Sequence, residues 1–276
     1  MTPTTHGIDW GNLETGFQPG KAHEGLYIVR GLPGTGKTTF ASGCPDSLLI
    51  DCDPQHGGKY VMGGRAARAN VTNWDEFDKL HKTLLKDAKE NKDGRRFKMV
   101  IVDPASLFLN HCRAAMCKKL GVPEIDGFDH GKVANLFREK LLDLAYNGYY
   151  WIVVDQLMRR TALAKSGGGE AVFTEALLPN SVVKYLEADC HHILTISLQP
   201  QAVTETVNGK PVQRMAMTGR IVETKPGTQK TSIANPKSRV WLPEKFNLPN
   251  ANSAAIWDSF SATYDRAVAE MQDAIK

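Results

Sequence analysis

A glycine-rich segment near the start of the chain has the residue types that hold phosphate groups. It reads Gly31-Leu-Pro-Gly-Thr-Gly-Lys37-Thr38-Thr39 and meets the pattern G-x-x-x-x-G-K-[ST]. Glycines let successive backbone N–H groups point at phosphate oxygens, and a helix that opens at Lys37 adds its positive end. Lys37 is expected to reach the β- and γ-phosphates, and the Thr38 hydroxyl to coordinate Mg²⁺. We therefore expect ATP and Mg²⁺ as cofactors, with the nucleotide held by Gly31, Pro33, Gly34, Thr35, Gly36, Lys37, Thr38 and Thr39.

Asp103 is the expected second ligand of the metal. It ends an apolar run at 99–103, which predicts a buried strand that stops in an acid. A carboxylate at that point can hold the water bound to magnesium beside the glycine-rich loop. An ordinary turn aspartate before Pro104 is the alternative, but the loop upstream favours the metal role. Thr38 and Asp103 are thus the predicted metal residues.

Three further side chains follow apolar runs and could act on a phosphate or on water. Asp51 and Asp53 follow the run at 48–51, where a carboxylate could orient or deprotonate the attacking water, and the residues alone leave both open. Gln156 ends the run at 151–156, and its amide could hydrogen-bond the γ-phosphate or the catalytic water. Lys37 and Asp103 complete the expected catalytic group.

Basic residues cluster in two places. Residues 159–169 contain Arg159, Arg160 and Lys165 among small residues and glycines, a composition expected of a loop that orders on a nucleic-acid backbone. A solvated surface loop fits this composition equally well. Residues 205–245 contain eight Lys or Arg and three Asp or Glu, which indicates either a surface that faces phosphate or a solvated face.

The elements needed to position these residues follow from the pattern of apolar residues. Strands are expected at 26–30, 48–51, 99–103, 151–156 and 192–197, and helices at 73–92, 105–120, 130–146 and 181–188. Runs at 202–207 and 212–218 flank Asn208-Gly209, a strong hairpin signal, and short strands are expected at 221–223 and 239–242. Strands that alternate with helices predict a parallel sheet, with the antiparallel hairpin at one edge.

Composition fits one globular α/β core. The chain has 276 residues, 42% hydrophobic and 23% charged, and a net charge of +4 that does not by itself imply nucleic acid. The five cysteines are scattered, and the start of the sequence shows no secretory signal, so a cytoplasmic protein with free thiols is expected. No apolar run approaches the roughly 18 residues of a membrane helix, so we expect no membrane contact.

Together these segments resemble the RecA-like recombinase core over residues 26–242. The resemblance implies a RecA-like ATPase core at 25–245, with an N-terminal arm at 1–24 and a C-terminal helical tail at 246–276. Leu49-Ile-Asp-Cys-Asp53 is similar to the family's strand that ends in the catalytic carboxylate, which implies Asp53 as the base, with Asp in place of the usual Glu. The strand that ends at Gln156 is similar to the family's nucleotide-sensing strand.

The resemblance also implies partners. The family's two DNA-binding loops correspond to about 120–130 and 159–170, and a basic β segment that starts at Arg220 is similar to the region that reaches ATP on a neighbouring subunit. The residues implied in that contact are Lys225, Lys230, Lys237 and Arg239. A homo-oligomer, ring or filament, that binds single-stranded DNA is therefore expected.

The short core, with Gly-Leu-Pro-Gly-Thr-Gly-Lys-Thr-Thr-Phe-Ala followed closely by Leu-Leu-Ile-Asp-Cys-Asp, resembles the minimal RecA-like ATPases of bacteriophages. This implies an ATPase stimulated by DNA that works in phage-type recombination, annealing or replication, with other phage proteins as partners and the host cytoplasm as its location. A nucleotide-gated scaffold or helicase-loader module with slow hydrolysis is the alternative. A P-loop small-molecule kinase is less favoured, because a glutamine and a glycine-rich loop follow the strand.

Overall fold

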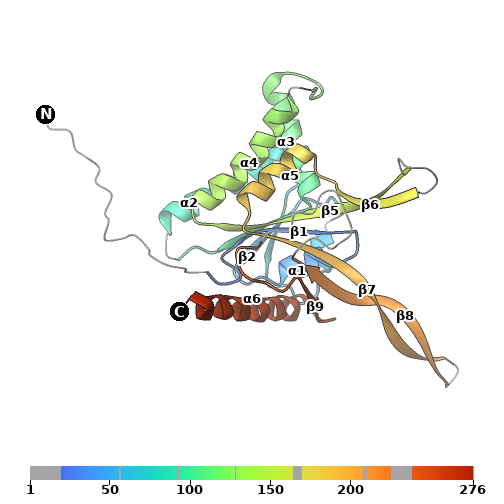
Figure 1. The fold of residues 1–276 in the computed structure, drawn as a ribbon. Coiled ribbons are helices and arrows are strands. Elements are labelled where there is room, and N and C mark those ends of the chain that lie inside the picture. The colour runs from blue at the N-terminus through green and yellow to red at the C-terminus, as the bar shows by residue number, and fades with distance from the viewer. Residues whose placement is uncertain are drawn as a thin grey trace.

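The computed structural model describes residues 20–55, 57–91, 94–127, 129–163, 170–207, 210–224 and 238–275. The elements along the chain are β1 (Leu26–Gly31), α1 (Lys37–Ser42), β2 (Ser47–Asp51), η2 (Gly57–Tyr60), β3 (Ala67–Asn70), α2 (Trp74–Glu90), β4 (Met99–Asp103), α3 (Ala105–Leu120), α4 (His130–Tyr146), β5 (Tyr150–Leu163), β6 (Glu170–Ala176), α5 (Asn180–Asp189), β7 (His192–Val207), β8 (Lys210–Glu223), β9 (Lys245–Leu248) and α6 (Ser253–Ile275). Within this described part, nine strands form one sheet with helices on both faces (Figure 1).

The sheet is mostly parallel. Its order is β3-β2-β4-β5-β1-β7-β8-β9, with β6 paired to β5 off this path. The strands from β3 to β7 in this order pair in parallel, whereas β8, β9 and β6 pair antiparallel. The predicted fold class, α/β with a mostly parallel sheet, flanking helices and an antiparallel edge, is confirmed.

The central strands are apolar on both sides because both faces of the sheet are covered. All residues of β2 and β4 are buried, as expected of parallel strands between two helical layers. On one face, strand residues such as Ile28 and Val153 pack with α2, α3, α4 and α5. On the other face, Val29 and Val154 pack with α1 and α6 (Figure 1).

The helices lie close to where their periodicity predicts them. Helices α3 and α4 have the expected bounds, α2 begins one residue late and ends two residues early, and α5 is one residue longer at each end. Helix α2 begins at a cap in which the Asn73 side chain accepts a hydrogen bond from the Glu76 backbone N–H. The Glu76 carboxylate in turn accepts from the Thr72 backbone N–H at 2.7 Å.

The expected loop at 159–169 is wrong over its first half. Strand β5 continues to Leu163 and pairs antiparallel with β6, so Arg159 and Arg160 lie on a strand. The run from Glu170 to Ala176 pairs with residues 157–163 and supplies their backbone hydrogen-bond partners. The apolar pattern of 151–163 alone does not reveal this partner strand. Lys165 lies outside the described residues.

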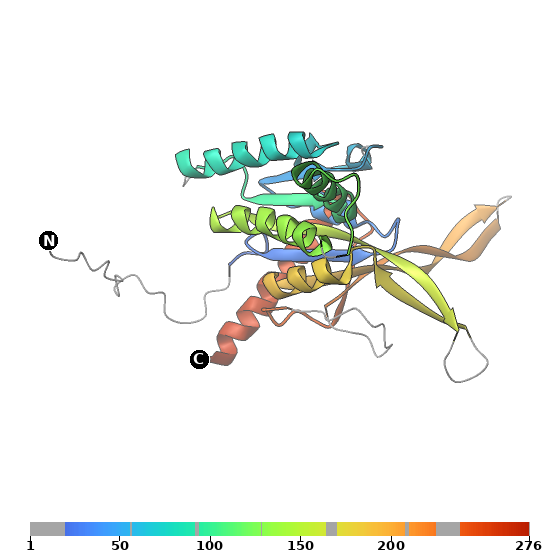
Figure 2. The same cartoon turned by 90° about the horizontal axis from the view of Figure 1, so that it is seen from above.

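Strands β7 and β8 are also longer than expected. The predicted short strand at 192–197 and the separate run at 202–207 form one strand, with a register shift between Gln199 and Pro200 that admits the proline. Val207 pairs with Lys210, which confirms the hairpin. Both the β7–β8 pair and the β5–β6 pair project beyond the body of the sheet as two-stranded arms (Figures 1 and 2).

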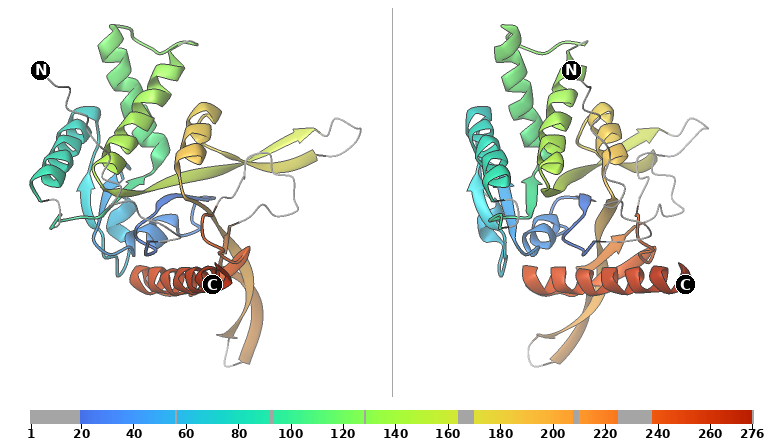
Figure 3. Two further views of the ribbon diagram at one scale, coloured as in Figure 1. Left: turned by 60° about the vertical axis from the view of Figure 1, so that its left-hand side comes forward. Right: turned by 90° about the vertical axis from the view of Figure 1, so that its left-hand side faces the viewer.

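The strand expected at 239–242 does not form, and the nearest pairing in the described residues is an isolated bridge between Ser238, just before the segment, and His192. Strand β9, which the sequence did not predict, takes the edge beside β8 instead. Beyond it, the helix expected within 246–276 is α6, which lies across the face that carries α1 (Figure 3). Phe40 of α1 packs on Trp257 and Phe260 of α6 with ring centroids 5.2 Å apart in each pair.

The expected N-terminal arm at 1–24 is described only from Gly20 onward. Ala22 is buried there, and its carbonyl accepts a hydrogen bond from the Tyr27 hydroxyl at 2.6 Å. Within the described ranges, no helix has the length and apolar character needed to cross a membrane.

Candidate functional site

The parallel sheet brings the predicted site residues to one edge. Asp51 lies beside Asp103 in the β2–β4 register, and Gly31 lies beside Gln156 in the β1–β5 register. The carboxyl ends of parallel strands are where ligands bind in such sheets. A pocket of about 200 Å³ opens there, lined by Pro33, Gly34, Lys37, Thr38, Asp51, Asp53, Gly57, Gly58, Asp103, Pro104 and Gln156.

The glycine-rich loop joins β1 to α1 in the conformation that its glycines permit. Gly34 and Gly36 have φ of +77° and +90°, values that favour glycine. A side chain at Gly31 would collide with the Ile196 carbonyl of β7. Gly34 and Gly36 therefore permit the tight turn of the loop, and Gly31 permits its close packing on β7.

Lys37 is already turned into the loop. Its Nζ donates hydrogen bonds to the carbonyls of Gly31 and Leu32, each at 2.9 Å. Burial lowers the pKa of Lys37, while Asp103 and Asp155 act to raise it. The ammonium group is thus held under the loop, where it can exchange a carbonyl for a phosphate oxygen.

Thr38 and Asp103 form a direct pair. The Thr38 hydroxyl donates to Asp103 Oδ2 at 2.6 Å, and Asp103 is 8% exposed. Burial raises the pKa of Asp103 to about 6, although the hydrogen bond from Thr38 and the charge of Lys37 act to lower it. A buried carboxylate of this kind is stabilised by a nearby cation.

These two groups fit the expected Mg²⁺. The hydroxyl and carboxylate oxygens are the hard ligands that Mg²⁺ prefers, and they converge on the pocket beside the loop. The described residues contain no cluster of three or more His, Cys, Asp or Glu that could hold a metal alone.

Asp51 and Asp53 both line the pocket, yet backbone groups already bond their oxygens. Asp51 accepts from the N–H groups of Asp53 at 3.1 Å and Gly58 at 3.2 Å. Asp53 accepts from Gln55 at 2.9 Å and Gly57 at 3.2 Å. Asp51 is 2% exposed, whereas Asp53 is only half-buried, so Asp53 has the better access to a ligand.

Gly57 and Gly58 are site residues that sequence reasoning missed. A Cβ atom at Gly57 would lie 2.9 Å from Asp53 Oδ2, and one at Gly58 would lie 2.8 Å from Asp51 Oδ2. A side chain at either position would therefore have to displace a carboxylate oxygen of the site. A pair of glycines shortly after two acids was the available signal.

Gln156 lies at the junction of two pockets. Besides the pocket above, it lines a second pocket of about 440 Å³ together with Leu32, Pro33, Leu157, Met158, Arg159 and Leu177. The lining of this second pocket is almost wholly apolar. The Gln156 carbonyl is fixed by the Leu177 N–H at 2.8 Å. A movement of Gln156 would therefore change the shape of both the pocket beside the glycine-rich loop and the apolar pocket.

A buried ion network lies directly behind the site. Arg30, 1% exposed, contacts Asp155 Oδ2 at 3.2 Å and Glu187 Oε1 at 2.8 Å. Arg30 precedes Gly31 and Asp155 precedes Gln156, so the network joins the two strands that carry the loop and the glutamine. Burial raises the pKa of Asp155 to about 6, against the charge of Arg30. Sequence reasoning did not single out any member of this network.

Of the residues predicted to contact DNA or a neighbouring subunit, those that the structure describes do not line the pocket beside the glycine-rich loop. Arg159 is exposed on the β5–β6 arm, and Arg160 is exposed beside Glu175, with 3.2 Å between Nε and Oε2. The loop expected at 120–130 lies at the outer end of the α3–α4 pair (Figure 3). Arg239 is exposed. The other expected interface residues, Lys225, Lys230 and Lys237, fall outside the described residues.

Comparison with known proteins gives one family. The family described as AAA domain matches residues 26–231, from β1 through the basic β segment. No curated protein matches the chain significantly. A KaiC-like protein, PH0186 from the hyperthermophilic archaeon Pyrococcus horikoshii OT3, is similar in structure at 13% identity, over 82% of this chain and 91% of that one, with a TM-score of 0.40.

Proposed function

The chain belongs to the AAA domain family of P-loop ATPases, and from this premise we propose that it hydrolyses ATP in response to single-stranded DNA. The observation that carries the ATPase half is the pocket in which Lys37, Thr38 and Asp103 converge beside Gln156. Bound Mg²⁺ would supply charge neutralisation for the phosphates. Lys37 would bind the phosphates, and Asp53 or Asp51, at the carboxyl end of β2, would orient the attacking water.

The DNA half rests on the two arms and on the surface beside Gln156. The arms β5–β6 and β7–β8 continue past the carboxyl edge of the sheet, so they rise from the edge that holds the pocket (Figure 2). Arg159 offers an exposed guanidinium for a backbone phosphate, and the apolar pocket beside it offers a dry surface for a base. Gln156 lines both pockets, which supports coupling between the nucleotide and a bound strand.

We place this activity in phage-type recombination, annealing or replication, on the resemblance of the short core to bacteriophage RecA-like ATPases. The active form is a homo-oligomer, ring or filament, with ATP at the subunit boundary. Lys225, Lys230, Lys237 and Arg239 are the candidates for contact with the neighbouring subunit's nucleotide. The exposed position of Arg239 is compatible with that role.

The test compares ATP turnover with and without single-stranded DNA at low salt. Stimulation of the wild type that is lost in the Arg159→Ala and Arg160→Ala double variant supports the DNA half. The control is Lys86→Ala, an exposed cation on α2 with side-chain exposure of 71%, which should keep the stimulation. Turnover that no strand stimulates, together with no binding at low salt, contradicts the DNA half and leaves the ATPase intact.

One observation favours a second function, a nucleotide-gated scaffold or loader module that hydrolyses slowly. Both Asp53 oxygens accept backbone hydrogen bonds, so this carboxylate is fixed in place and has fewer free lone pairs for an attacking water. The two functions differ in assembly. A mass measurement with a non-hydrolysable ATP analogue, with and without single-stranded DNA, shows whether nucleotide alone drives oligomerisation, as a scaffold requires.

A further inference from the structure

Arg220 of β8 lies against the glycine-rich loop. A Cβ atom built on Gly36 would lie 2.7 Å from Arg220 Nε and 3.3 Å from Cδ. The absence of a side chain at Gly36 is thus what admits the arginine to the loop. Strand β8 pairs with β7, and β7 pairs with β1, so the arginine approaches from two strands away.

The approach is from the side opposite to Asp103. Strand β1 has β5 and then β4, with Asp103, on one side, and β7 and then β8, with Arg220, on the other. The loop between β1 and α1 is therefore flanked by a carboxylate on the metal side and by a guanidinium on the far side. A polyphosphate in the loop would have a cation available from each direction, with Lys37 beneath it.

Most N–H donors of Arg220 have no hydrogen-bond acceptor among the described residues. Its Nη1 donates to Asn250 Oδ1 at 3.2 Å, and its Nε is buried without a partner among the described residues. An arginine carries five N–H donors in a planar fork that matches phosphate oxygens. No carboxylate of the described residues pairs with this guanidinium, so its charge is not neutralised from within that part of the chain.

We propose that Arg220 binds the phosphates of the nucleotide held by its own subunit, as a further binding residue of the site. The inference rests on the proposed nucleotide binding. The resemblance implies that the basic β segment reaches ATP on a neighbouring subunit, whereas Arg220 lies against the glycine-rich loop of its own chain. Since β8 also forms the projecting arm, the contact would connect the nucleotide to that arm.

The experiment measures ADP affinity by calorimetry, and the thermal unfolding midpoint with and without ADP. Arg220→Ala should weaken ADP binding about 10- to 100-fold and reduce the rise in midpoint that ADP causes, because a charged hydrogen-bond donor is lost. Arg220→Lys, which keeps the stem and the charge, should lie between Arg220→Ala and the wild type. The midpoint without ADP should stay near that of the wild type.

Two controls make the result decisive. Arg214→Ala removes an arginine of the same strand that pairs with Glu205 on the arm, and it should bind ADP normally. Lys37→Ala should abolish binding. If Arg220→Ala and Arg220→Lys bind ADP like the wild type while Lys37→Ala does not, the inference is overturned and nucleotide binding stands. If the wild type itself fails to bind ADP, the proposed nucleotide binding and the role of Arg220 are both contradicted.

A mixing experiment separates the same subunit from its neighbour. Subunits with Lys37→Ala keep Arg220, and subunits with Arg220→Ala keep the loop lysine. If Arg220 acts on its own subunit's nucleotide, a mixture of the two binds ADP no better than the average of the separate proteins. Restored affinity in the mixture would show that the arginine reaches a neighbour, and would overturn the inference.

Discussion

The Thr38 hydroxyl lies 2.6 Å from Asp103 Oδ2, although 65 positions separate the two residues. Thr38 belongs to the helix that follows β1, and Asp103 ends β4, with β5 between the two strands. The pair therefore depends on the order of the parallel strands and not on local sequence. It joins the glycine-rich loop to the strand that ends in Asp103, so a substitution of either residue should change the surroundings of the other.

The first prediction concerns the pH dependence of stability without nucleotide. Burial raises the pKa of Asp103 to about 6 from its ordinary value of 3.8, so the folded state holds a proton that the unfolded state releases. The free energy of unfolding therefore falls as pH rises from about 4 to 6. Asp103→Asn should remove the part of this fall that Asp103 causes, on the order of 2–3 kcal/mol. Urea unfolding at a series of pH values measures it.

Asp155 has a pKa raised in the same direction to about 6, so part of the slope remains in the Asp103→Asn variant. Thr38→Val removes the hydrogen bond that lowers the pKa of Asp103 and should extend the sloping region to higher pH. An Asp103→Asn protein with the full slope of the wild type would show that Asp103 is ionised like an exposed carboxylate.

The second prediction concerns Lys37. Lys37→Met should weaken ADP and ATP binding about 100-fold or more, because the charged donor to the phosphates is lost. Stability without nucleotide should change little, since the loss of two hydrogen bonds to carbonyls is offset by relief of a buried charge. Titration calorimetry and thermal unfolding measure the two effects. Lys86→Met, an exposed lysine of α2, is the control, and a Lys37→Met protein with normal affinity refutes the role.

Much of this site is readable from sequence because its signals are local. A glycine-rich loop between a buried strand and a helix, and an acid at the end of another buried strand, are each visible within about ten residues. Parallel strands then bring Asp103 and Gln156 to the same edge as the loop. Helices α3 and α4 were predicted to the residue for a similar reason, since their apolar periodicity is strong.

The features that the sequence did not reveal depend on distant partners. Strand β5 runs to Leu163 only because β6 pairs with it, and β7 spans Pro200 because β8 continues on its other side. Arg220 shows nothing in its local sequence that distinguishes it from other basic residues of the segment. Its contact with Gly36 requires two strand pairings, and the Arg30 network requires the packing of α5.

The third prediction separates Asp51, the last residue of β2, from Asp53, which follows the strand. Asp53→Asn should lower ATP turnover about 100-fold or more, as expected for a residue that orients water, with little effect on stability. Asp51→Asn should cost about 1–3 kcal/mol of stability, because Asp51 is buried and bonds the Gly58 N–H and the Asp53 N–H. Steady-state kinetics and urea unfolding of both variants measure this. The reverse pattern would assign the base to Asp51.

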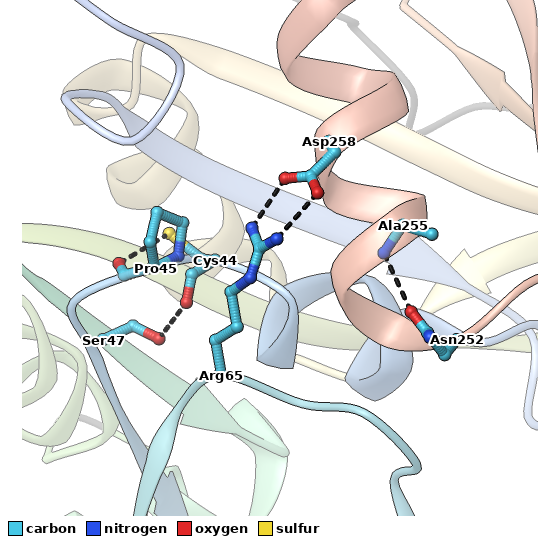
Figure 4. Close-up of polar contacts among 7 residues, drawn as sticks. All are labelled: Cys44, Pro45, Ser47, Arg65, Asn252, Ala255 and Asp258. Carbon is cyan, nitrogen blue, oxygen red and sulfur yellow. Dashed lines mark hydrogen bonds and ion pairs between the residues drawn. The ribbon is translucent and has the colours of Figure 1, made fainter.

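The last prediction concerns the docking of α6 on the helix of the phosphate loop. Asn252 accepts from the Ala255 N–H at the start of α6, and Arg65 forms a two-pronged ion pair with Asp258 at 2.6 and 2.7 Å (Figure 4). Ser253 Oγ donates to the Thr39 carbonyl of α1 at 2.5 Å. Trp257, 1% exposed, packs on Phe40 of the same helix.

These contacts should differ greatly in their contribution to the free energy of unfolding. Trp257→Ala should cost about 3–5 kcal/mol of stability, because it opens a cavity between α6 and α1. Arg65→Ala should cost less than about 1 kcal/mol, because Arg65 and Asp258 are 38% and 56% exposed and solvent screens the pair. Urea unfolding measures both, with Trp257→Phe as the milder control. Since α1 follows the phosphate loop directly, Trp257→Ala should also weaken ADP binding, whereas Arg65→Ala should not. A larger cost for Arg65→Ala than for Trp257→Ala would mean that the ion pair, and not the buried ring, holds α6 in place.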